Sequence, residues 1–180
     1  LGPPGEHPPL QTRALIVEDA APRDDAVSLR VRVEGIDVDG RERAASGGVS
    51  LTVAGPAALA RAGQWRKGRE VRLPVTFRRV PRYLNDGVGN YERDAAVDGL
   101  ALVGTVKSGL LVDLLRHGSR MEEAAGRARA HVRRSVARWV GSSDPVRAGI
   151  VTAILIGDRT GLPPTVRDRL QAAGTYHVIA

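Results

Sequence analysis

The chain has 180 residues, of which 42% are hydrophobic and 26% charged, a balance typical of a folded domain rather than a disordered segment. It has no cysteine, which excludes disulfides, thiolate metal sites and a cysteine nucleophile. Its net charge of +7 is uneven, because residues 61–82 alone carry eight Lys or Arg against one Glu. Such a basic segment suggests a polyanionic partner, either nucleic acid or an anionic membrane surface, although a solvated arginine-rich surface has the same composition.

Five strands are predicted beyond the first ten residues, and the first four of them alternate between apolar and polar side chains. This alternation predicts strands with one buried and one solvated face, as in antiparallel sheets. The predicted strands are residues 13–18, 27–34, 49–53, 71–78 and 100–106. Residues 37–48, which include Asp39-Gly40, form the predicted turn between the second and third strands. Pro74 lacks a backbone donor, so its strand is expected at a sheet edge or with a bulge.

Two short helices are predicted among these strands. Residues 56–63 are Ala-rich and end in glycine, and a second helical piece between Asn90 and Gly99 precedes the last strand. Five short strands with an intruding helix fit a small, partly open Greek-key barrel, of which the OB-fold is the commonest, and its exposed face and loops bind oligonucleotides. The sequence therefore predicts an α+β fold, with a small OB-like five-stranded antiparallel β-barrel followed by amphipathic helices.

The remaining chain is predicted to be helical. Ser119 and Glu122 have the spacing of a capping box, and they precede a basic amphipathic helix of about two dozen residues. One interpretation lays this helix on a membrane surface, and the other packs its alanine stripe against protein. We favour the second, because alanine buries little area. Asp144 is expected to cap another helix that runs to Gly157, and residues 163–174 predict a further one.

The sequence contains no recognisable catalytic or metal-binding motif. Its four histidines are scattered without metal-ligand spacing, and no phosphate loop, nucleophile elbow or dinucleotide fingerprint is present. Asp158 lies in a Gly-Asp-x-x-Gly turn, where an aspartate more often bonds its own backbone than acts as an acid. We therefore expect no catalytic residue, no metal and no cofactor, and do not expect an enzyme.

A long motif near the C-terminus resembles a known family. The run AILIGDRTGLPP at residues 153–164, together with residues 167–170 and AGTYHVIA at 173–180, is similar to the opening of the competence domain of ComEC-type channels. These inner-membrane proteins carry transforming DNA into bacteria. In that family Ser-Gly and the first membrane helices come next, so the resemblance implies a longer parent protein with spans before and after this chain.

The upstream part resembles the family more loosely. Family members have an N-terminal OB-like domain with a basic strand, and residues 78–82 stand in that register, followed by Asn85-Asp86-Gly87 and Asn90-Tyr91. Asp86 stands where proline is usual, and Gly89-Asn90 stands where the family has an aromatic and an acid. The resemblance covers roughly residues 11–180 and is strongest beyond about residue 100.

The resemblance implies four parts. They are a Pro/Gly-rich linker at 1–10, an OB-like barrel at 11–107, a basic amphipathic helical segment at 108–141, and the truncated start of the membrane channel domain at 142–180. The barrel would lie on the extracytoplasmic side of the bacterial inner membrane. There it would handle DNA during transformation, with non-specific single strands, the rest of the channel and a membrane surface as expected partners.

The candidate DNA-binding residues are the cations and aromatics in and beside the basic segment. They are Arg66, Lys67, Arg69, Arg72, Arg78, Arg79, Arg82, Trp65, Tyr83 and Tyr91. If they gather on one barrel face, DNA binding is favoured. If they scatter, the alternative is a purely structural barrel that braces the membrane helices and meets lipid headgroups or partner proteins. An unrelated enzyme is a third hypothesis, which the missing motifs disfavour.

Overall fold

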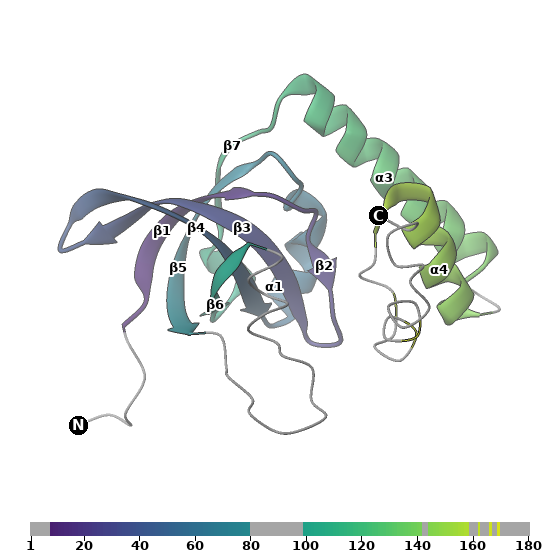
Figure 1. The fold of residues 1–180 in the computed structure, drawn as a ribbon, viewed down its shortest axis with the longest axis horizontal. Coiled ribbons are helices and arrows are strands. Elements are labelled where there is room, and N and C mark those ends of the chain that lie inside the picture. Colours follow the sequence, from purple (N-terminus) through teal and green to yellow (C-terminus); the bar gives the residue numbers. More distant parts are fainter. Residues whose placement is uncertain are drawn as a thin grey trace. The chain divides into compact units, whose positions relative to one another are not determined.

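The computed structural model describes residues 8–79, 99–141 and 144–158, together with the single positions 162, 166 and 169. The chain divides into two compact units, Leu1–Glu123 and Ala124–Ala180. The fold is α+β, and the first unit contains a mixed seven-stranded sheet (Figure 1). Its strands are β1 (Leu10–Ile16), β2 (Ala21–Pro22), β3 (Ala26–Val38), β4 (Arg41–Ala54), β5 (Glu70–Arg79), β6 (Leu100–Val106) and β7 (Asp113–Arg116).

The strand pairing is antiparallel except between β4 and β6. β3 lies between β1 and β4, and β6 lies between β4 and β5, which also pairs with β1 and β7. The expectation of a wholly antiparallel sheet is therefore wrong, because β4 and β6 run parallel from Gly48↔Leu100 to Val53↔Val106. Between these two strands the chain forms β5, so β6 is not the second arm of a hairpin with β4 and is free to run alongside it in the same direction.

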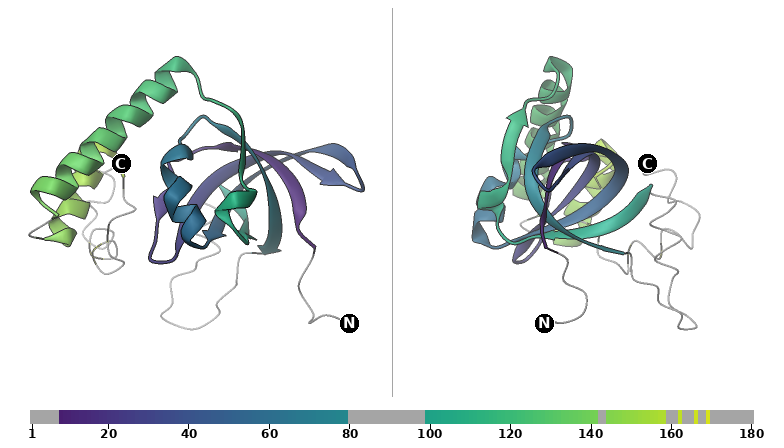
Figure 2. Two further views of the ribbon diagram at one scale, coloured as in Figure 1. Left: turned by 180° about the vertical axis from the view of Figure 1, so that it is seen from behind. Right: turned by 90° about the vertical axis from the view of Figure 1, so that its left-hand side faces the viewer.

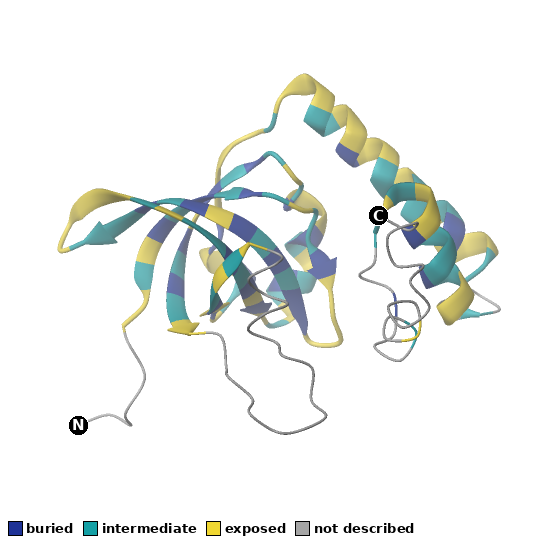
Figure 3. Ribbon diagram, in the orientation of Figure 1, coloured by how far each residue is buried: buried dark blue, intermediate teal, exposed yellow. Residues whose placement is uncertain are grey.

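The turn between β3 and β4 is much shorter than expected. Instead of a connection over residues 37–48, the strands pair as far as Val38↔Arg41, and only Asp39 and Gly40 form the turn. Both have positive φ, 55° and 75°, which is the two-residue geometry that suits the twist of paired strands. The charged tip of this hairpin is exposed (Figure 3). Because the residues near this tip are polar, apolar alternation along the sequence did not indicate that the strands continue to the turn.

One hydrophobic core fills the first unit. Buried positions alternate along the strands, which curve strongly around it (Figures 2 and 3). Gly104 of β6 lies so close to the core that a Cβ there would be 2.6 Å from Val75 Cγ1 and 2.7 Å from Leu51 Cδ2. Trp65 is also part of this core. The buried strand residues include Ala14, Ile16, Val27, Leu29, Val31, Val49, Leu51, Val53, Val71, Leu73, Val75 and Val106.

Pro74 of β5 occupies a position that tolerates a missing donor. On one side it is opposite Gln11 of β1. On the other side, β7 pairs with residues 70–72 and β6 with residues 76–79, so Pro74 falls between the two pairings. The proline therefore interrupts neither of them.

The helices agree with the sequence signals where the structure describes them. α1 (Pro56–Arg61) and the short 3-10 turn η1 (Ala62–Gln64) cover the predicted helix 56–63. α3 (Arg120–Trp139) opens with the expected capping box, in which Ser119 N donates to Glu122 Oε2 at 2.7 Å and Glu122 N donates to Ser119 Oγ at 3.3 Å. The predicted helical piece at 90–98 lies outside the described residues, as does most of 163–174.

α4 (Pro145–Ile156) has the predicted ends. Asp144 Oδ1 accepts hydrogen bonds from Val146 N at 3.0 Å and Arg147 N at 3.1 Å, and Gly157 ends the helix with φ 68°. Among the described residues, none of the helices combines the length and the apolar character needed to cross a bilayer.

Candidate nucleic-acid interface

The exposed arginines of β5 lie at opposite ends of that strand. Arg72 is opposite Arg13 of β1 and Asp113 of β7, whereas Arg78 and Arg79 are opposite Val103 and Leu102 of β6. At about 3.3 Å per residue, Arg72 and Arg78 are about 20 Å apart along the strand. The three side chains are exposed but do not form one patch.

Two of the predicted DNA-binding residues are buried. Trp65 is only 2% exposed and packs in the core, and Arg69 is 8% exposed. Arg69 binds Glu123 through two hydrogen bonds, Nε to Oε1 at 2.6 Å and Nη2 to Oε2 at 2.7 Å, and its Nη1 donates to Gln64 O at 2.7 Å. The alternation of β5 explains the burial, because position 69 has the same parity as the inward-facing Val71. We leave both residues out of the candidate interface.

The other predicted DNA-binding residues either lie in the turn before β5 or fall outside the described residues. Lys67 is exposed in the turn before β5. Arg66 is half-buried there, with Nε donating to Gly63 O at 3.1 Å and Nη1 at 3.9 Å from Glu123 Oε2. Arg82, Tyr83 and Tyr91 lie outside the described residues.

The surface around Arg72 carries carboxylates that oppose phosphate binding. Arg13 is the hub of an ion network there, with Nε 2.6 Å from Glu42 Oε1 and Nη1 3.0 Å from Glu34 Oε2 and 3.1 Å from Glu70 Oε1. The hydrogen bond from Arg13 is the main cause that lowers the pKa of Glu70 below its ordinary value. An adjoining pocket of about 390 Å³ is lined by Glu42 and Asp37 as well as Arg72. An incoming phosphate would meet these anions as well as the arginine.

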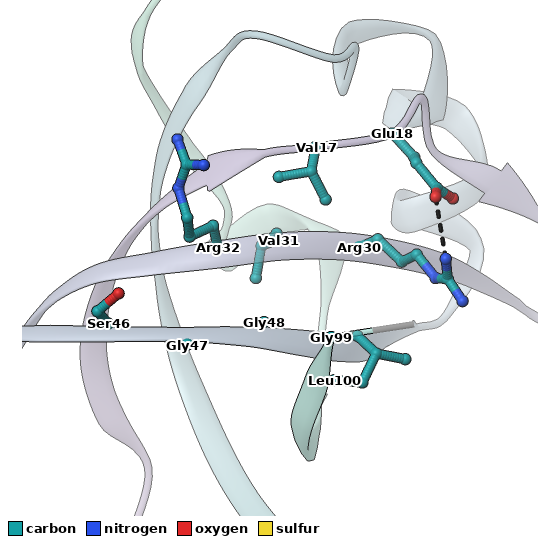
Figure 4. A pocket seen from close by; sticks show the side chains of 10 residues that line it. All are labelled: Val17, Glu18, Arg30, Val31, Arg32, Ser46, Gly47, Gly48, Gly99 and Leu100. Atoms are coloured by element: carbon teal, nitrogen blue, oxygen red, sulfur yellow. Dashed lines mark hydrogen bonds and ion pairs between the residues drawn. The ribbon is translucent and has the colours of Figure 1, made fainter. Parts of the chain in front are cut away.

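A second pocket, across β3 and β4, has a charge that suits phosphate binding better. It has a volume of about 310 Å³ and is bordered by the segment after β1 and the start of β6 (Figure 4). Arg30 and Arg32 line it from β3, and Glu18 is the acid of its lining. Arg30 Nη1 is 3.0 Å from Glu18 Oε1, whereas Arg32 is exposed and its side chain has no ion pair or hydrogen bond within the described part of the chain.

Backbone, rather than side chains, forms much of this pocket beside Arg32. Gly48 of β4 is directly opposite Arg32 in the sheet, and Gly47 precedes it. A Cβ on Gly48 would lie 2.2 Å from the carbonyl oxygen of Gly99, so only glycine fits where β4 meets the start of β6. In the resulting site, a cation that has no partner among the described residues lies beside an open backbone surface. Such a site suits an anionic group attached to a flat or extended ligand.

The density of basic residues along the sequence does not point to this site, which lies on β3 and β4 outside the basic segment 61–82. The alternation of β3 already put Arg30 and Arg32 on the solvated face, and a Gly-Gly pair inside a strand marks a close approach of backbones. Those two signals together could have located the pocket. Among the described residues, no three His, Asp or Glu side chains gather in a way that could hold a metal ion.

Comparison with known proteins adds no assignment. No family model matches the chain, and neither a curated protein nor a solved structure does.

Proposed function

We propose that this chain contains the extracytoplasmic DNA-handling module of an inner-membrane competence channel, an OB-like barrel that binds single-stranded DNA weakly and without sequence preference. Two features support the OB-like part. The pairings run β1–β3–β4–β6–β5 and return from β5 to β1, and α1 lies in the chain between β4 and β5. The resemblance of residues 153–180 to the competence-domain motif supports the channel. The proposal includes no catalytic step.

The observation that carries DNA binding is the pocket across β3 and β4. In an OB-fold, the second and third barrel strands present the face that receives oligonucleotides, and here those strands are β3 and β4. Arg32, which has no ion pair among the residues that the structure describes, offers its guanidinium group to a phosphate, and the glycines opposite leave space for the sugar or base. The described pocket has no aromatic side chain on which a base could stack, so we expect affinity no tighter than roughly micromolar at physiological salt.

Fluorescence anisotropy with a labelled oligodeoxynucleotide tests this assignment. The Arg32→Glu variant should lose most of the binding at low salt. Arg134→Glu, which makes the same change of charge at an exposed site on α3, should retain it. A third variant, Arg78→Glu/Arg79→Glu, measures what the end of β5 contributes. Affinity should fall steeply with salt, because bound phosphates release counterions. Equal binding by the wild type and Arg32→Glu would remove the pocket from the interface.

A second candidate function is a structural barrel that braces the membrane domain and meets lipid headgroups or partner proteins. The scatter of the predicted cations favours it, because Arg69 is used in an ion pair and Arg72 lies beside carboxylates. The same titration separates the two functions. If the wild-type chain fails to bind single strands even at low salt, while circular dichroism shows that it is folded, the structural function replaces DNA binding.

A further inference from the structure

Four leucines lie exposed within six residues of the first unit. Their exposed fractions are 67% for Leu110, 45% for Leu111, 36% for Leu114 and 41% for Leu115. We call residues 110–115 the leucine segment. It spans the end of the short 3-10 turn η2 (Gly109–Leu111) and most of β7, whose residues are all exposed (Figure 3). Single exposed apolar residues are ordinary, but a cluster of this density marks a surface that meets something other than water.

The fold holds these leucines outward. Gly109 is buried against α1, so closely that a Cβ there would lie 2.5 Å from Ala58 Cα, and Arg61 Nη1 donates to Gly109 O at 2.9 Å. Val112, in the middle of the segment, is 2% exposed and belongs to the core. Because the chain is fixed before and after Leu110 and Leu111, these two side chains have no route into the interior.

Cations flank the leucine segment on both sides. Lys107 precedes it, and Arg116 and Arg120 follow it, while Asp113 is the one acid between residues 107 and 120. Arg116 pairs with Glu70, with Nε 3.0 Å from Oε2. Lys107 and Arg120 are exposed and make no ion pair within the described ranges. Leucines flanked by exposed cations combine apolar area with the positive charge that anionic lipid headgroups attract.

We propose that the leucine segment binds the surface of an anionic bilayer, with Leu110 and Leu111 inserted at the headgroup boundary and Lys107 and Arg120 on the lipid phosphates. A protein partner fits the segment less well, because it lacks the aromatic anchors that supply most binding energy in protein interfaces, and leucine is under-represented among such hot-spot residues. The segment contributes no residue to the pocket across β3 and β4. The inference therefore does not depend on DNA binding.

Vesicle flotation tests the inference with two lipid compositions, phosphatidylcholine alone and phosphatidylcholine mixed with phosphatidylglycerol. The chain should float with the mixed vesicles and much less with the neutral ones. Leu110→Ser/Leu111→Ser should lower the partition coefficient at least about tenfold, because two exposed leucines lose their apolar area. The matched control is Ile154→Ser/Leu155→Ser, an adjacent pair on α4 with exposed fractions of 63% and 61%, which should bind like the wild type.

A site-specific probe gives a second measurement that does not require a destabilising change. The chain has no cysteine, so Leu110→Cys accepts a single environment-sensitive fluorophore. Its emission should shift to the blue on mixed vesicles, whereas the same fluorophore on Asp24→Cys, an exposed position before β3, should not shift.

Three outcomes would overturn the inference. They are no flotation of the wild type with mixed vesicles at low salt, equal loss of binding in the α4 control, and a fall in sedimentation mass in Leu110→Ser/Leu111→Ser. The last result would mean that the segment joins protein chains instead of lipid. DNA binding by Leu110→Ser/Leu111→Ser, measured by anisotropy, should stay unchanged, which separates a failure of this inference from a failure of the proposed function.

Discussion

Arg69 and Glu123 form an ion pair that is largely shielded from solvent, with 10% and 14% of their side chains exposed. Hydrogen bonding from Arg69 outweighs the cost of burial and lowers the pKa of Glu123 from 4.5 to about 2. A carboxylate whose folded pKa lies below its unfolded pKa stabilises the fold at pH above the unfolded value. That contribution is lost as the pH falls from about 4.5 towards 2.

The first prediction concerns this pair. Glu123→Gln should reduce the free energy of unfolding of the first unit at pH 7 by up to about 3 kcal/mol, the value that corresponds to the shift in pKa. It should also flatten the decline of that free energy between pH 5 and 2, which urea titrations at several pH values would measure. Glu18→Gln is the control, because Glu18 pairs with Arg30 in an exposed setting and should contribute less than about 1 kcal/mol. An unchanged pH profile in Glu123→Gln would contradict the prediction.

The second prediction concerns Gly104. Gly104→Ala places a methyl group against two buried core side chains, so it should destabilise the first unit by about 1–3 kcal/mol through overpacking. Gly63→Ala is the matched control, since its Cβ would meet nothing within 4 Å. Urea unfolding of both variants provides the comparison. If Gly104→Ala and Gly63→Ala were equally stable, β6 could move away from Val75 and Leu51 without loss of stability, and the prediction would be wrong.

At the residue scale, the sequence predicted capping residues well and burial of charge poorly. Ser119 and Asp144 act through bonds to backbone atoms a few residues away, so their roles follow from local spacing. The burial of Arg69 depends on its ion pair with Glu123, which lies 54 residues further along the chain, and no local sequence pattern predicts such a distant partner. The tryptophan at position 65 was equally ambiguous, because an indole suits a base as well as a core.

At the scale of elements, the third prediction concerns the hairpin between β3 and β4. Gly40 has φ 75°, a conformation that costs other residues about 1–2 kcal/mol. Gly40→Ala should therefore lower the free energy of unfolding by about 1 kcal/mol, although a Cβ there would meet no atom within 4 Å. Asp39→Asn should be nearly neutral, because asparagine adopts positive φ readily. Thermal unfolding of both variants checks this, and an unchanged Tm in Gly40→Ala would contradict the assigned turn geometry.

The predicted strands exist, but their pairing was only partly foreseeable. Apolar alternation located the segments that became β1, β3, β4 and β5, and residues 100–106 were also predicted as a strand, which became β6. It could not locate β7, whose residues are all exposed, or the two-residue β2. Nor does alternation say which strands become neighbours. The parallel pairing of β4 with β6 depends on the path of the whole chain rather than on either strand.

At the scale of the molecule, the fourth prediction concerns where the first unit ends. The sequence predicts a barrel at residues 11–107, and the first compact unit of the structure, Leu1–Glu123, also contains β7 and the start of α3. A fragment of residues 8–107 lacks β7, Val112 and Glu123, which leaves Arg69 without its partner. It should be less stable than a fragment of residues 8–123 by more than about 3 kcal/mol. Urea unfolding measures the difference, and equal midpoints would show that residues 108–123 add nothing to the stability of the first unit.

The return of β5 to β1 and the placement of β6 against β4 also affect the synthesis of the chain. Thr12 pairs with Leu73, about sixty residues later, and β4 gains its second neighbour only when Leu100 and the residues after it have been made. A nascent chain that has reached the end of β4 therefore carries open edges on both β1 and β4. The edge of β1 closes once β5 has been made, whereas the edge of β4 stays open until β6 has been made, which takes roughly 2–10 s at 5–20 residues per second. During that interval, two neighbouring nascent chains can pair through these edges, so slower translation beyond Ala54 should increase aggregation rather than relieve it.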